Sequence, residues 1–146
     1  AEADRADRSH TLDAAFLDRT FTRIDQSIAM AALFAAHHMR ASAIVSLTQS
    51  GSTALWVTRI DSGIPVYALT PEESSRRRMT LFRECHPVAM QYRSYDMPAV
   101  LADVERLMLE NGLVKNGDLV VITVGEPVGK SGGTNNLKIV RIGSHS

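Results

Sequence analysis

Two loops of the chain carry residue types that bind anions. The first reads Thr48-Gln49-Ser50-Gly51-Ser52-Thr53 and stands between a strand-like run and the start of a helical pattern. It offers four hydroxyl groups, a glycine that lets the backbone approach a ligand closely, and the free amides of a helix N-terminus. These groups predict a cradle for a phosphate. The alternative is that Ser52 or Thr53 only caps the helix, and the residues leave both interpretations open.

The second loop follows the most hydrophobic strand-like run and contains Gly129-Lys130-Ser131-Gly132-Gly133-Thr134. A Walker A loop needs four residues between its glycines and a helix after it. Gly125 and Gly129 are separated by only three residues, and a strand-like segment follows, so we exclude an ATPase of that class. The pattern favours a flexible loop that closes over a ligand of the first loop, and the alternative is an ordinary connection.

Other reactive side chains lack the partners that chemistry would require. His37 and His38 are neighbours on a helical segment, so their side chains point about 100° apart and do not form a metal-binding face. Cys85 has Gln91 six positions later, where a thiol phosphatase needs arginine, so we expect a buried or incidental thiol. No nucleophile or acid–base pair can be assembled, and we expect neither catalytic nor metal-binding residues in this chain.

Composition limits the class of protein. The 146 residues suffice for one domain, and 16 Lys+Arg balance 16 Asp+Glu to a net charge of zero. That balance argues against nucleic acid or an anionic membrane as the main partner. A single cysteine and the lack of a long apolar run predict a soluble, cytoplasmic domain. The basic run Arg76–Arg78 is either a solvated helix face or a contact for an anion or another chain.

Hydrophobic periodicity indicates the elements that would position the two loops. Apolar residues at helical spacing predict a helix over residues 24–39, whose buried face would comprise Ile24, Ile28, Ala31, Ala32, Ala35, Ala36 and Met39. Short runs with β-branched residues predict strands at 43–48, 65–70, 87–92, 118–125 and 137–142. Further helices are expected from 53 to about 61–63, from 70 to about 84 and over 97–111.

This alternation predicts an α/β three-layer sandwich with a five-stranded, mostly parallel sheet. The first four strands should be parallel through right-handed crossovers. The last should be an antiparallel edge strand, because the loop of about eleven residues before it has no helical pattern. Ligands of open parallel sheets bind beyond the carboxyl ends of the strands, where the strand order reverses. Both anion-binding loops follow strands and are therefore candidates for that position.

The first nineteen residues are polar, show no sustained period and begin without methionine. We expect residues 1–19 to be a surface lead-in or a linker from a larger protein, and residues 20–146 to form the α/β domain.

Four segments, in this order, resemble the C-terminal regulatory domain of bacterial pyruvate kinases. They are RTFTRIDQSIAMAALF (19–34), LTQSGSTALW (47–56), VYALT (66–70) and GEPVGKSGGTN (125–135). The resemblance covers about residues 10–142 and is nearest to members activated by AMP or sugar monophosphates. Pyruvate kinases transfer phosphate from phosphoenolpyruvate to ADP, giving pyruvate and ATP in glycolysis. That chemistry uses Mg²⁺ and K⁺ in a catalytic barrel whose motifs have no counterpart here, so the resemblance implies no cofactor for this domain.

The resemblance implies an allosteric role for the two loops. In the family the phosphate of an effector binds in the loop matching Thr48–Thr53, and the loop matching Gly129–Thr134 closes over it. Gln49 stands where many fructose bisphosphate-activated members carry lysine. With little fixed positive charge beside the cradle, one phosphate is easier to accommodate than two, which favours AMP or a sugar monophosphate.

The resemblance also implies that residues 1–19 are the linker from a preceding catalytic barrel domain. It further implies a tetrameric parent, in which this domain contacts its own barrel and a second copy of itself. The alternative function, from a different class, is a stand-alone α/β interaction or assembly domain that binds no effector.

Overall fold

Helices and strands alternate along the part of the chain that the structure describes. The structure is a computed structural model that describes residues 24–48, 52–60, 62–82, 84–92, 94–125 and 134–143, so the expected lead-in over residues 1–19 lies outside it. In chain order the elements are α3 (Ile24–Met39), β1 (Ala43–Leu47), α4 (Ser52–Thr58), β2 (Val66–Thr70), α5 (Glu73–Met79), β3 (Cys85–Ala89), α6 (Met97–Glu110), β4 (Leu119–Gly125) and β5 (Thr134–Arg141).

The five strands form one sheet in the order β3-β2-β1-β4-β5. β1 pairs in parallel with both β2 and β4, and β2 pairs in parallel with β3. β5 pairs antiparallel to β4 at the outer edge of the sheet. The predicted four parallel strands and antiparallel edge strand are confirmed. The strand order reverses between β1 and β4, because the chain first adds β2 and β3 on one side of β1 and then β4 on the other.

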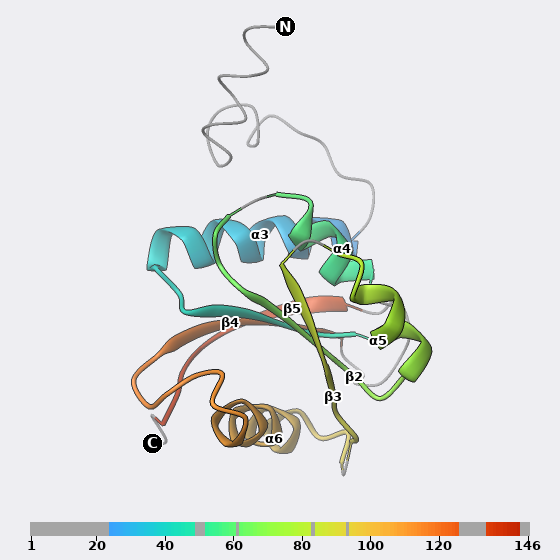
Figure 1. Cartoon of the computed structure of the whole chain (residues 1–146). Helices are drawn as coiled ribbons and strands as arrows, with labels where there is room; N and C mark the ends of the chain where they lie inside the picture. Colours follow the sequence, from blue (N-terminus) through green and yellow to red (C-terminus); the bar gives the residue numbers. More distant parts are fainter. Residues whose placement is uncertain are drawn as a thin grey trace, which may run out of the picture.

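Helices cover both faces of this sheet (Figure 1). α3, α4 and α5 lie on one face, and α6 lies alone on the opposite face among the described elements. The molecule is therefore the three-layer α/β/α sandwich that the sequence predicts. Successive side chains of a strand point to opposite faces, so each central strand contributes to both cores.

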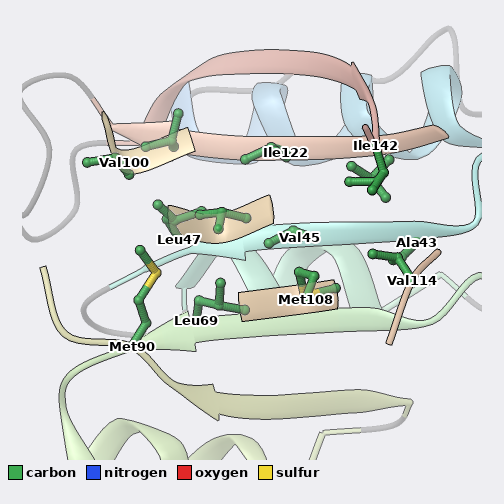
Figure 2. Packing of buried hydrophobic residues seen from close by; sticks show 13 residues of the cluster. Ala43, Val45, Leu47, Leu69, Met90, Val100, Met108, Val114, Ile122 and Ile142 are labelled. Atoms are coloured by element: carbon green, nitrogen blue, oxygen red, sulfur yellow. The ribbon is translucent and has the colours of Figure 1, made fainter. Parts of the chain in front are cut away.

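The larger core lies between the sheet and α6. Val45 and Leu47 of β1 lie between Ile122 of β4 and Leu69 of β2, as Figure 2 shows. α6 covers them with an apolar stripe at helical spacing, formed by Val100, Val104 and Met108, each 1% exposed. The bounds of α6, Met97–Glu110, agree with the predicted helix over 97–111 to within one residue.

The helix α3 has the predicted bounds but turns a different face to the sheet. Its buried apolar residues are Ala29, Met30, Ala32, Leu33 and Ala36. Ile24 and Met39, both expected in the core, are 69% and 47% exposed. The helix carries apolar residues on several of its faces, so their spacing fits more than one buried stripe. The stripe that packs is rich in alanine, whose small side chain lets the helix approach the sheet closely.

The predicted ends of α4, β3, α5 and β5 are wrong. α4 was expected to reach residues 61–63 but ends at Thr58. β3 was expected over 87–92, but its pairing with β2 starts at Cys85 and ends at Ala89. α5 was expected to reach residue 84 but ends at Met79, and Glu84 has a positive φ of 55° that no helix can contain. β5 begins at Thr134, three residues earlier than expected, because it pairs with the whole length of β4.

Pro87 fits within β3 because this strand is at the sheet edge. The Met90 amide donates to the Thr70 carbonyl, and the Glu84 carbonyl accepts from the Val66 amide. Even-numbered residues of β3 therefore turn their backbone groups toward β2, whereas Pro87 turns its nitrogen to the free edge. No ladder hydrogen bond is lost there.

The packing of α3 predicts the effect of a core truncation. Leu33→Ala should lower the free energy of unfolding by about 2–5 kcal/mol, because Leu33 is 0% exposed and its loss leaves a cavity. The matched control Leu81→Ala, at a side chain that is 85% exposed, should change it by about 0.5 kcal/mol or less. Urea denaturation followed by circular dichroism measures both, and equal losses would contradict the observed burial.

Candidate functional site

The two predicted anion-binding loops leave the sheet at adjacent strands. Thr48 directly follows β1, and Gly125 ends β4, which is the parallel neighbour of β1. Both loops therefore start at the point where the strand order reverses, which is the usual ligand position in open α/β sheets. This is the edge that the sequence predicts for a ligand.

The structure describes the two ends of each loop. Of the predicted site residues, Thr48, Thr53 and Thr134 are described with their side chains, and Ser52 is described as the first residue of α4. The remaining predicted residues, Gln49, Ser50, Gly51, Gly129, Lys130, Ser131, Gly132 and Gly133, lie outside the described residues.

A hydrogen bond joins the ends of the two loops. The hydroxyl of Thr53, in the first turn of α4, donates to the hydroxyl of Thr134, the first residue of β5, at 2.8 Å. The two side chains are 81 residues apart in sequence, and they are only 1% and 7% exposed. Two residues that the sequence assigns to separate loops are thus in direct contact.

Thr48 contributes differently from its neighbours in the motif. Its amide donates to the carbonyl of Leu69 at 3.0 Å and so extends the pairing of β1 with β2 beyond the last strand residue. The side chain is 7% exposed. The Thr48 amide therefore belongs to the sheet, and it is not among the amides offered to a ligand.

A second pair of buried hydroxyls was missed from the sequence. Ser46 and Thr123 are register partners on β1 and β4, and the Thr123 hydroxyl donates to the Ser46 hydroxyl at 2.9 Å. Both residues are 0% exposed. The signal was present as one polar residue inside each of two apolar strands, but only the register shows that they face each other. This pair satisfies its own hydrogen bonds within the sheet.

Two arginines of the basic run on α5, Arg76 and Arg77, lie in different environments. The guanidinium of Arg76 donates from Nη1 to the carbonyl of Thr70 at 3.0 Å, so it lies at the carboxyl end of β2. Arg77 forms an exposed ion pair with Glu73 at 3.2 Å. One positive charge is therefore held at the same edge of the sheet as the two loops, whereas Arg77 belongs to the solvated face.

Cys85 is the buried thiol that the sequence predicts. It is 7% exposed and lies under α5 in a small cluster with Ala54, Ala68 and Met79. Burial raises the pKa of the Cys85 thiol from its ordinary value of 9.0 to about 11. Thiolate is the reactive form, so this environment suppresses nucleophilic chemistry.

The described part of the chain offers neither a metal-binding cluster nor a membrane-spanning helix. No group of three or more His, Cys, Asp or Glu residues in that part of the chain could hold a metal ion. Within the same part, no helix is both long and apolar enough to span a membrane.

Comparisons with known proteins converge on one family. Residues 26–140 match the family described as pyruvate kinase, alpha/beta domain. The chain is 33% identical over 127 residues to pyruvate kinase II of Salmonella typhimurium, covering 86% of this chain and 26% of that protein. It is 36% identical over 129 residues to the pyruvate kinase of Buchnera aphidicola subsp. Schizaphis graminum, again covering 86% of this chain and 26% of the relative. The chain thus spans about a quarter of the length of these relatives.

The environment of Cys85 predicts slow thiol chemistry. The native chain should react with Ellman's reagent at pH 8 at least about a hundredfold more slowly than the urea-unfolded chain, because a pKa near 11 lowers the thiolate fraction about that much. Cys85 is the single cysteine, so the absorbance reports on it alone.

The same shift predicts a loss of stability in alkali. The protonated thiol contributes to the free energy of unfolding. This contribution is fully present below pH 9 and declines as the pH rises from 9 toward 11, because the thiol ionises first in the unfolded chain. Cys85→Ala should lack this part of the pH dependence in urea titrations.

The labelling experiment has its own contradicting outcome. Equal rates of reaction with Ellman's reagent for the native and the unfolded chain would show that the thiol is accessible.

Proposed function

Because the chain belongs to the family of pyruvate kinase C-terminal α/β domains, we propose that it is the effector-binding regulatory domain of a pyruvate kinase. The parent enzyme would transfer phosphate from phosphoenolpyruvate to ADP in the cytoplasm, with Mg²⁺ and K⁺ bound in its own catalytic barrel. This chain would carry no catalytic residue and no cofactor. Its ligand would be a small phosphorylated metabolite, either AMP or a sugar monophosphate.

The contact between Thr53 and Thr134 is the observation that carries this proposal. It brings the ends of both loops to one place at the reversal of strand order. Residues 48–53 and 129–134 together supply hydroxyls, glycines and Lys130, which are the groups that proteins use to hold phosphate. Arg76, held at the carboxyl end of β2, adds a positive charge at this edge. A single phosphate matches this modest charge better than two.

The elements α3 and β5 support a second part of the proposal, association with another copy of the chain. β5 ends the sheet, so its outer backbone groups have no strand neighbour within the described residues. α3 packs beside it, since Leu137 of β5 joins the α3 core. Each element exposes a large apolar side chain on this side of the sheet: Phe34 is 38% exposed and Ile139 is 44% exposed. A matching surface from a second copy would cover both.

Ligand binding should stabilise the chain. AMP or ribose 5-phosphate at a hundredfold excess over its dissociation constant should raise the free energy of unfolding by about 2.7 kcal/mol, because only the folded state binds. Ser50→Asp should abolish the effect, since a carboxylate repels phosphate. Ser42→Asp, at an exposed serine before β1, is the matched control and should bind normally. Calorimetric titration and thermal melting measure both.

These data also separate the proposal from the alternative of a stand-alone assembly domain. An assembly domain would show no heat and no melting shift with AMP, ribose 5-phosphate or other phosphorylated metabolites. A melting shift that survives Ser50→Asp would place the ligand elsewhere.

Self-association should depend on Ile139. Ile139→Lys would put a charge on the outer strand and should weaken the association of two copies at least tenfold in sedimentation equilibrium. Leu81→Lys changes an equally apolar but separate exposed residue after α5 and should leave the association unchanged. An effect of both variants alike would point to a different surface.

A further inference from the structure

We propose that Thr134 is a positioning residue that couples an anion bound at Thr53 to the edge strand β5. The inference rests on the proposed function, because it assumes that Thr53 donates to the ligand. It adds the path by which binding would reach a distant element. Thr53 and Thr134 are bonded to each other at 2.8 Å, from α4 and β5 respectively.

The surroundings of the pair make this bond strong. Thr53 is 1% exposed and Thr134 is 7% exposed, and the neighbouring α4 residues Ala54 and Val57 are each 0% exposed. In such a place water competes little for the hydroxyl groups, so the hydrogen bond has more of its intrinsic strength. A hydroxyl left without a partner there would lower stability.

The chemistry of the two partners makes the bond sensitive to a ligand. A hydroxyl can donate one proton and also accept, so two hydroxyls can share a hydrogen bond in either direction. In the structure Thr53 donates to Thr134. A phosphate oxygen without a proton only accepts, so a bound anion requires Thr53 to donate toward the ligand. Thr134 then has to donate to Thr53, which gives a chain of two hydrogen bonds, each strengthening the other.

Thr134 lies where β5 is joined least regularly to the sheet. From Asn136 to Arg141 the strand pairs residue by residue with β4. Between Val124 and Gly125 the register shifts, so that Gly125 pairs with Thr134 and Asn135 is the extra residue of a bulge. The first residue of β5 is therefore held by its bond to α4 as well as by the ladder. Fixing the Thr134 hydroxyl by a ligand should order this end of the strand.

The test compares hydroxyl deletions at two buried pairs in the 146-residue chain. Thr134→Val removes the donor but keeps the shape, and it should weaken the binding of AMP or ribose 5-phosphate about fivefold in calorimetric titrations. Thr134→Ser restores the hydroxyl and should bind within twofold of the wild type. Thr123→Val breaks the other buried pair, whose hydrogen bond joins β1 to β4 and not α4 to β5, and should also bind within twofold.

Hydrogen exchange of the wild-type chain gives a second measurement that needs no variant. Ribose 5-phosphate should slow exchange of the amides of residues 134–141, whereas amides of β3 at the opposite edge should change little. This measurement tests the coupling even if the Thr134→Val variant does not fold.

The outcomes separate this inference from the function on which it rests. If neither probe binds the wild-type chain, the effector role and the coupling are both refuted. If a probe binds but Thr134→Val binds as tightly as the wild type, only the coupling is refuted. The coupling is also refuted if Thr123→Val loses as much affinity, if Thr134→Ser does not recover it, or if exchange in β5 is unchanged.

Discussion

The parallel pairing of β1 with β4 is the contact on which the rest of the structure depends. It joins residues that are 77 positions apart in sequence, and helices cover the two strands on both faces of the sheet, α6 on one face and α3 on the other. The Ser46–Thr123 hydrogen bond fixes the register on the α3 face. One consequence is that the chain leaves both strands at the same edge. The closeness of Thr53 and Thr134 follows from this pairing and does not need a separate explanation.

Most of the fold could be predicted from the sequence, because strand and helix signals alternate and the last connection has no helical pattern. The face of α3 could not, since apolar residues such as Ile24 and Leu33 both fit its period, and only packing selects Leu33. The ends of β3 follow its partner's register, which no local pattern carries. At the site, residue types indicated both loops, but the bond between Thr53 and Thr134 is a long-range contact. The ligand itself stays a prediction.

Because the net charge is zero, the position of individual charged side chains matters more than the total charge. Lys and Arg equal Asp and Glu in number, so the chain has no overall field to attract an anion. Arg76 shows how a charge is placed instead: its guanidinium is tied to the Thr70 carbonyl at the carboxyl edge, while Arg77 is neutralised by Glu73 in solvent. Recognition of an anion at this edge would rest on short-range, directional hydrogen bonds. Such bonds depend less on salt than surface charge does.

The two edges of the sheet are not equivalent, and this decides what kind of assembly the domain can form. β3 carries Pro87 with its nitrogen at the free edge, which removes a donor that an incoming strand would need, whereas β5 carries no proline. A sheet with two receptive edges can add copies head to tail without limit and grow into a filament. With one edge blocked, an association through β5 would pair it with the β5 of a second copy about a twofold axis. Growth would then stop at the pair, so Pro87 would guard against fibre formation from the opposite edge of the sheet.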